Sequence, residues 1–96
     1  MDELLRALAD PTRREALRLL RDRDLSAGEL AQRFPLARST LSEHLAVLRD
    51  AGLVVTERQG TTIRYSLHVA AFEEAVAAVI GLLARRGGSR RKKVSS

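Results

Sequence analysis

Hydrogen-bonding side chains gather on one short stretch of the chain, LARSTLSEHLAVLRDAGL at residues 36–53. Leu41, Leu45 and Leu48 recur there at helical spacing and predict a helix with one buried face. The other positions carry mainly arginine, glutamate and short hydroxyls, whereas a helix that is only solvated tends to carry paired Lys and Glu. Short hydroxyls let another surface come close. The stretch therefore favours recognition of a binding partner.

Two of these polar residues, Arg38 and Ser42, are expected to project from the side of the helix opposite the leucines. On a helix that lies in a DNA major groove, this is the side that meets the base edges. A phosphate contact at the start of the helix is the alternative role for Arg38.

Enzymatic chemistry is not indicated by any motif of the sequence. We find no nucleophile paired with a base, no paired carboxylates in an evident cleft and no glycine loop that could cradle a phosphate. His44 and His68 fall in different predicted elements and do not make a site. Because the chain has no cysteine, disulfides and thiolate metal ligands are impossible. We predict that the protein is not an enzyme and uses no cofactor.

The segments around the first stretch predict a helix-turn-helix followed by two strands. Ser26 and Glu29 form a capping-box pattern at the start of a helix of about two turns, which Pro35 ends. A turn of about three residues then leads into the next helix, as in a helix-turn-helix. Gly52 provides a left-handed C-cap, and the β-prone run 53–58 follows at once.

A β-hairpin is predicted for residues 53–58 and 62–67, because Ile63, Tyr65 and Leu67 alternate with polar residues. Two arginines would flank its polar tip, which suits contact with a phosphate backbone or a minor groove. An ordinary polar hairpin tip is the alternative. The candidate wing residues are Arg58, Gln59, Thr61, Thr62 and Arg64. The predicted fold is mainly α with a small β-hairpin, a winged helix-turn-helix with the element order α-α-α-α-β-β-α.

Helices with apolar faces are predicted at both ends of the folded part. The first ends at Asp10 and Pro11, which can cap and begin a second helix, and the last runs over 69–83. If the helix-turn-helix core is covered by the other helices, a second copy of the chain is the simplest partner for these faces. Close packing of an alanine-rich helix within a monomer is the alternative. The candidate interface residues are Leu4, Leu5, Leu8, Phe72, Val76, Val79, Ile80 and Leu83.

Charge is distributed unevenly along the 96 residues. The net charge of +5 arises because residues 1–84 hold 11 arginines against 12 acidic residues, while residues 85–96 add six cations. We predict one domain over residues 1–84 and a basic disordered tail over 85–96. Four arginines on the second helix, Arg13, Arg14, Arg18 and Arg21, are interpreted as a solvated face, with phosphate contact by some of them as the alternative.

Membrane insertion and export are not predicted. No apolar run reaches the roughly 18 to 20 residues of a membrane span, and the first residues are acidic where a signal peptide would be basic. We therefore expect a cytoplasmic protein.

Four segments together resemble a known family, the ArsR-type winged-helix transcriptional repressors, and most closely its autorepressor branch. They are ALADPTRREALRLL at 7–20, LSAGELAQRF at 25–34, STLSEHLAVLRDAGLV at 39–54 and RQGTTIRYSL at 58–67. The resemblance covers about residues 4–83 and is highly specific because the segments occur in combination.

The resemblance implies a homodimer joined through the first and last helices, with residues 39–49 in the major groove and the hairpin as wing. It directs toward DNA the residues Arg38, Ser39, Thr40, Ser42 and Glu43. His44 matches a recurrent family histidine that would position the helix, touch phosphate or only pack. Ala37 departs from the family, which often has a serine N-cap there. Either Ser39 caps the helix one turn later, or the helix start is held less well.

Metal-sensing members of the family carry paired cysteines that would fall at Ser26 and Gly28, and neither residue can replace a thiolate. Their alternative sites on the last helix need acidic residues and histidines at helical spacing. Here only Glu73 and Glu74 are present, adjacent and diverging, with His68 before the helix. We therefore expect no metal.

The sequence thus predicts a sequence-specific DNA-binding transcriptional repressor that acts as a homodimer on an operator, without a metal site. The alternative is a winged-helix protein-interaction module, with non-specific attraction to nucleic acid through the basic tail. Neither prediction involves a membrane.

Overall fold

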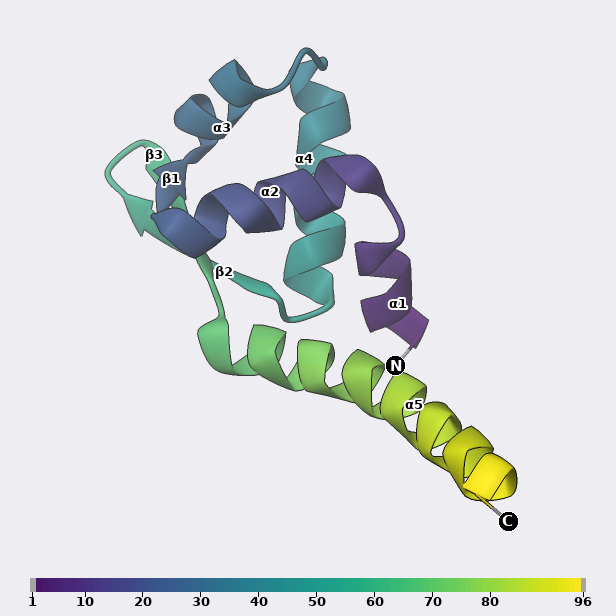
Figure 1. The fold of residues 1–96 in the computed structure, drawn as a ribbon. Coiled ribbons are helices and arrows are strands. Elements are labelled where there is room, and N and C mark those ends of the chain that lie inside the picture. Colours follow the sequence, from purple (N-terminus) through teal and green to yellow (C-terminus); the bar gives the residue numbers. More distant parts are fainter. Residues whose placement is uncertain (1, 96) are drawn as a thin grey trace.

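The computed structural model describes the backbone of residues 2–95 and the side chains of residues 2–84. Its helices are α1 (Asp2–Leu8), α2 (Pro11–Asp22), α3 (Ala27–Arg33), α4 (Arg38–Asp50) and α5 (Val69–Ser95), and its strands are β1 (Leu25–Ser26), β2 (Val54–Gln59) and β3 (Thr62–Leu67) (Figure 1). The predicted winged helix-turn-helix is confirmed, and β1 is added to the predicted order of elements.

A core of leucine, valine and alanine holds these elements together. Its buried members are Ala7, Ala16, Leu17, Leu20, Leu25, Leu30, Leu41, Leu45, Leu48, Leu53, Val54 and Ala75. The three leucines of α4 are all among them, so the predicted buried face of this helix is confirmed. Each buried leucine contributes about 1.5–3 kcal/mol relative to an exposed one, and together the three fix the rotation of α4 about its own axis.

The starts of α2 and α3 are capped as the sequence predicts. The side chain of Asp10 accepts hydrogen bonds from the backbone N–H groups of Thr12 at 2.7 Å and Arg13 at 3.3 Å. At α3, the N–H of Glu29 donates to the hydroxyl of Ser26 at 3.0 Å, and the N–H of Ser26 donates to the Glu29 carboxylate at 2.8 Å. These local bonds satisfy N–H groups that the first helical turn leaves without partners.

The sheet has antiparallel strands in the order β1–β3–β2. β2 and β3 form the predicted hairpin, in which Gln59 pairs with Thr62 across a turn where Gly60 adopts a φ of 65°. The sequence does not predict β1, because a strand of two residues is too short to show alternation. β1 pairs Leu25 with Tyr65, and this pairing ties the start of α3 to the hairpin.

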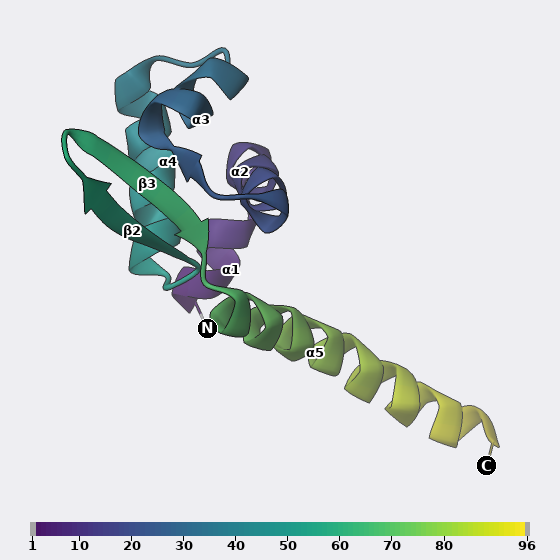
Figure 2. The ribbon, with the colours of Figure 1, turned by 90° about the vertical axis from the view of Figure 1, so that its left-hand side faces the viewer.

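Helix α5 leaves the rest of the molecule after its first turns, and its far end points away from the hairpin (Figure 1; Figure 2). It runs to Ser95, whereas the apolar pattern predicts an end near Leu83 and a disordered tail beyond. The arginines and lysines of this stretch are good helix formers, whereas Gly87 and Gly88 are poor ones, and a helix needs no apolar face to continue. The division into a domain at 1–84 and a tail at 85–96 stays a prediction. No helix among the described residues has the length and apolar character to cross a membrane.

Candidate nucleic-acid interface

Helices α3 and α4 form the helix-turn-helix, with α4 as its second helix. The chain leaves α3 at Phe34 and enters α4 at Arg38. Because the leucines of α4 are held in the core, most of its other side chains are exposed to solvent. The exposed residues include all five that the sequence directs toward DNA from this helix, Arg38, Ser39, Thr40, Ser42 and Glu43. The helix thus presents a hydrogen-bonding surface on a rigid element.

Arg38 and Ser42 do not lie opposite the leucines, so that part of the sequence prediction is wrong. Both line a shallow pocket of about 50 Å³ together with two of the buried leucines and Tyr65 of β3. At 3.6 residues per turn, positions separated by three, four and seven fall on the same side of a helix. The side chains that point most directly away from the core are therefore Ser39 and Glu43.

The start of α4 has no side-chain cap. Ala37 occupies the N-cap position with an extended backbone, at φ −61° and ψ 147°, and its side chain makes no capping hydrogen bond. Ser39 lies within the first turn and does not take over this role. Of the two alternatives, the structure supports a helix start that is held less well. Unpartnered N–H groups at a helix start also suit an approaching phosphate oxygen.

The hairpin has the position of a wing, but its two arginines point to opposite faces. Residues paired across antiparallel strands share a face, so Arg58 shares one face with Ile63 and Arg64 shares the other with Glu57. The two arginines therefore flank the tip from opposite faces and do not form one surface. The Nε atom of Arg64 lies 3.7 Å from Oδ2 of Asp24, next to β1, and this ion pair turns Arg64 toward the body of the protein.

The tip of the wing is exposed at Arg58, Gln59, Thr61 and Thr62. Figure 2 shows this tip at the opposite end of the molecule from the far end of α5. The Nε2 atom of Gln59 donates to Oε1 of Glu57 at 2.8 Å. Sequence reasoning overlooked Glu57, whose carboxylate would repel a phosphate. It lies one residue before Arg58 and hence on the other face, so its carboxylate does not share a surface with the exposed Arg58 side chain.

His44 is half-buried and joins α4 to α2. Its Nδ1 atom lies 3.1 Å from Nη1 of Arg13 and 3.9 Å from Oδ1 of Asp10. Arg13 also donates from Nε to the carbonyl oxygen of Ala7 at 2.9 Å, and from Nη2 to that of Arg6 at 2.8 Å. The sequence suggested that Arg13 belongs to a solvated face. This interpretation is wrong for Arg13. Its acceptors come from α1 and α4, and no local pattern could reveal them.

The charge of Asp10 at this junction follows from the same contacts. Burial alone would raise the pKa of its carboxyl group. The backbone hydrogen bonds from Arg13 and Thr12, with the nearby charge of Arg13, outweigh burial and lower that pKa below its ordinary value. Asp10 is therefore ionised at neutral pH, and its negative charge stabilises the start of α2.

Comparison with known proteins agrees with this geometry. The sequence profile described as "Bacterial regulatory protein, arsR family" matches residues 10–56, from the cap of α2 into β2. The transcriptional repressor SdpR of Bacillus subtilis is 34% identical over 76 residues, which cover 79% of this chain and 84% of SdpR. This chain belongs to the ArsR family. It is a DNA-binding transcription regulator with a winged helix-turn-helix fold.

Other members of the ArsR family show the same likeness. The transcriptional activator HlyU of Vibrio cholerae is 47% identical over 64 residues, which cover 67% of this chain but only 59% of HlyU. The structure of an ArsR-like transcriptional regulator from Rhodococcus sp. RHA1 aligns with a TM-score of 0.77 at 32% identity, over 99% of this chain and 92% of that one. These relatives are named as transcriptional regulators, so the chain is grouped with regulators and not with enzymes.

The candidate metal ligands of this ArsR-family chain have other roles or lie apart. The Nδ1 atom of His68 accepts a hydrogen bond from the N–H of Ala71 at 3.0 Å and so caps the start of α5. Glu73 and Glu74 are exposed neighbours on that helix. Within the part of the chain that the structure describes, no three acidic or histidine side chains gather as a metal site.

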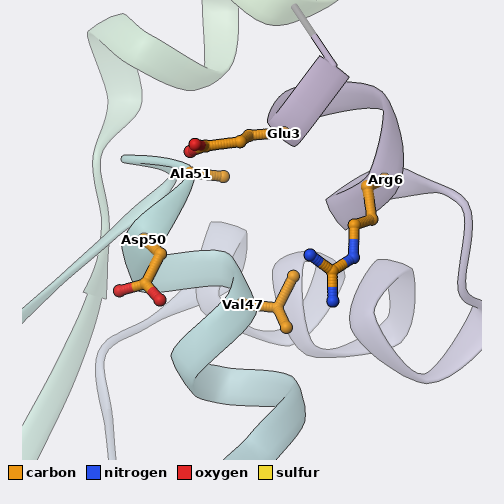
Figure 3. A pocket seen from close by; sticks show the side chains of 5 residues that line it. All are labelled: Glu3, Arg6, Val47, Asp50 and Ala51. Carbon is orange, nitrogen blue, oxygen red and sulfur yellow. The ribbon is translucent and has the colours of Figure 1, made fainter.

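A pocket of about 210 Å³ opens between α1 and the C-terminal half of α4 (Figure 3). Figure 3 shows Glu3 and Arg6 reaching toward it from α1, and Val47, Asp50 and Ala51 lining it from α4 and the residue that follows. Two carboxylates with a guanidinium among them are a poor cation site. The pocket shows instead that α1 and α4 are not packed tightly at this end.

The predicted dimer residues form an apolar surface over α1 and α5. Leu8 lines one apolar pocket of about 230 Å³ with Leu17, Phe72 and Val76. Leu4, Leu8, Phe72 and Val79 are half-buried, whereas Leu5, Val76, Ile80 and Leu83 are 43%, 39%, 57% and 68% exposed. Exposed apolar side chains beside such an apolar pocket are typical of a surface that another protein covers.

Proposed function

We propose that this ArsR-family regulator is a transcriptional repressor that binds a specific operator as a homodimer. The observation that carries the proposal is the polar, exposed surface of α4 above its buried leucines, because it combines base-contacting groups with a fixed orientation. The exposed Arg58 near the tip of the wing supports it as a candidate for a backbone contact. SdpR, which this chain matches over most of its length, is itself named a repressor.

The dimer is proposed from the exposed apolar residues of α1 and α5. A second copy is the occupant that fits best, since a symmetric partner offers the same row of side chains and two α4 helices can then reach successive major grooves. Such a dimer needs half-sites one helical turn apart, about 34–36 Å.

Binding is proposed to be independent of metals and thiol oxidants, and to take place in the cytoplasm with the DNA. The chain has no cysteine, and His68 already uses one ring nitrogen as a cap. Addition of zinc or peroxide should leave operator affinity unchanged. Stoichiometric zinc binding that releases DNA would reveal a site between subunits.

Selection of bound fragments from a random DNA pool tests the proposal, followed by competition over a salt series. A repressor should prefer its selected fragment over random DNA by about 4–10 kcal/mol. Deletion of residues 85–96 should weaken binding to the selected fragment and to random DNA by similar factors, and should make both affinities depend less on salt. The reason is that the six cations of this segment would contact phosphates without a fixed register. No preference in the intact chain would favour the protein-interaction module instead.

Because HlyU is named an activator, the direction of regulation needs its own test. A reporter gene driven by a promoter that overlaps the selected fragment should lose expression when the regulator is supplied. Increased expression would show activation and refute repression.

A further inference from the structure

We propose that Arg13 is a positioning residue for DNA recognition, because its guanidinium ties the last turn of α1 to His44 on α4. The inference rests on the proposed operator binding, in which α1 belongs to the dimer interface and α4 contacts the bases. It concerns a half-buried residue outside both proposed contact surfaces. Arg13 would fix how the recognition helix sits relative to the dimer.

Every nitrogen of the Arg13 guanidinium has an acceptor. Nε donates to the carbonyl oxygen of Ala7 at 2.9 Å, Nη2 donates to that of Arg6 at 2.8 Å, and Nη1 lies 3.1 Å from Nδ1 of His44. The donor directions of a guanidinium are fixed by its planar geometry. Three bonds to two helices therefore set the distance and the angle between α1 and α4 more closely than apolar packing would.

The contact also determines which ring nitrogen of His44 carries the hydrogen. A guanidinium only donates, so Nδ1 must accept and the hydrogen must sit on Nε2. Asp10 lies 3.9 Å from the same Nδ1, beyond hydrogen-bond distance, and its carboxylate already accepts from the N–H groups of Thr12 and Arg13. Arg13 is therefore the hydrogen-bond partner of His44.

The three hydrogen bonds of the Arg13 guanidinium are called the clamp below. Packing between α1 and α4 is too sparse to replace it. Ala7 is the fully buried residue of α1, and Leu4 and Leu8 are only partly buried against the core, so α1 offers limited apolar area to resist sliding. Toward the C-terminal end of α4 the two helices are separated by the open pocket lined by Glu3 and Asp50 (Figure 3). A directional contact is therefore needed where Arg13 lies.

The first test compares Arg13→Met with Arg14→Met in the full-length chain. Both variants lose a guanidinium and keep an apolar stem, but Arg14 donates only to the carbonyl oxygen of Leu8 at 2.8 Å, at the end of α1. Arg14 also lines the apolar pocket that contains Leu8 and Val76, so the oligomeric state of its variant is measured alongside DNA binding. We expect Arg13→Met to weaken binding to the selected operator about tenfold or more, and binding to random DNA far less. Arg14→Met should stay within about threefold of the wild type, and both should remain dimers.

A second pair of variants approaches the clamp from α4 and keeps the test decisive if Arg13→Met does not fold. His44→Asn places an acceptor oxygen near the position of Nδ1, whereas His44→Gln places its amide near that of Nε2. His44→Asn should retain operator binding, and His44→Gln should lose as much as Arg13→Met. Adding His44→Gln to Arg13→Met should cause little further loss, because Arg13→Met already removes the contact to His44 together with the two contacts to α1. The reverse order of the two His44 variants would overturn the proposal.

Nitrogen NMR of the labelled imidazole ring gives a readout that does not depend on DNA. We expect His44 to carry its hydrogen on Nε2 in the wild type and in Arg14→Met, and to lose this preference in Arg13→Met. If the wild-type protein prefers no DNA fragment, operator binding is refuted. The ring spectrum would still show whether Arg13 contacts Nδ1 of His44. An unchanged ring spectrum in Arg13→Met, or equal DNA losses in Arg13→Met and Arg14→Met, would refute the positioning role.

Discussion

Arginine side chains in this protein differ in what they contact, and substitutions should separate them. Arg13 is engaged by the backbone of α1 and by α4, and Arg64 lies beside Asp24. Arg38, at the first residue of α4, is exposed and lies next to the proposed base-contacting surface. Loss of Arg13 should change the position of α4 relative to α1, whereas loss of Arg38 should remove a contact to DNA.

We predict that Arg38→Ala lowers operator affinity by about 1–3 kcal/mol more than it lowers random-DNA affinity, because a bidentate contact to a base discriminates by that amount. Titrations over a salt series on both DNAs measure the difference. Arg49→Ala is the control, since Arg49 is exposed in the last turn of the same helix.

Equal loss on both DNAs, with a smaller salt slope, would assign Arg38 to a phosphate. The same result for Arg38, Ser42 and Glu43 together would rule out base contacts by α4.

Glu29 should make stability depend on acidity. The hydrogen bond from the Ser26 backbone, aided by the Ser26 hydroxyl and the charges of Arg23 and Arg64, lowers the pKa of Glu29 despite its partial burial. A lowered folded-state pKa stabilises the fold above the unfolded value of about 4.3, and this stabilisation is lost as the pH falls through the folded pKa. Glu29→Gln keeps an acceptor for Ser26 without the charge, so its unfolding free energy should fall less between pH 5 and pH 3.

Urea unfolding at a series of pH values measures this difference. Gln32→Ala, an exposed change on the same helix that removes no carboxylate, should retain the wild-type pH dependence. A Glu29→Gln variant with that same dependence would contradict the assignment.

Local hydrogen bonds could be predicted from the sequence, and long-range polar contacts could not. The caps at Asp10 and Ser26 join groups within three residues, so composition and spacing reveal them. The partners of Arg13 and Arg64 belong to segments that only the fold brings near. For the same reason, the exposed residues of α4 were predicted while the half-buried clamp behind them was not.

At the scale of elements, the faces of the wing follow from strand register. The hydrophobic alternation in β3 predicts which of its side chains turn inward, but it gives no register for β2. With Arg58 paired to Ile63, a shift of one residue would exchange every side chain between the two faces. Without the register, the sequence does not show that Arg58 and Arg64 flank the tip on opposite faces.

We predict that Ala37→Ser stabilises the protein by about 1 kcal/mol. Ala37 already has the extended backbone of an N-cap, so a serine hydroxyl could accept from an N–H of the first turn of α4 without strain. Thermal unfolding should show a midpoint higher by about 4–8 °C. Ala37→Val, which adds volume but no acceptor, serves as the control.

An Ala37→Ser midpoint no higher than that of Ala37→Val would show that the start of α4 gains nothing from a cap. If the proposed phosphate contact uses the same N–H groups, Ala37→Ser should also weaken binding to operator DNA and to random DNA equally.

At the scale of the whole molecule, the domain holds its core within α1 to β3, and α5 adds mainly surface. Ala75 is its buried residue within the described part, while Val76 and Ile80 remain exposed. The apolar periodicity of 69–83 predicts this face, but periodicity cannot tell a core-facing row from one that faces a partner. The position of the helix relative to the core determines whether its apolar row faces the core or a partner.

We predict that Val76→Asp combined with Ile80→Asp converts a dimer into a folded monomer and weakens operator binding by about 100-fold or more. Neither residue is buried in the core of this chain, so the fold should persist, whereas carboxylates within an apolar interface would be buried without partners. The loss at the operator follows because two half-sites would no longer be engaged by one linked pair of α4 helices. Ala70→Asp, exposed on the same helix but outside the predicted interface residues, is the control and should leave both properties unchanged. Ultracentrifugation with and without operator DNA measures both, and a wild-type monomer that binds the operator tightly would contradict the dimer and the half-site spacing together.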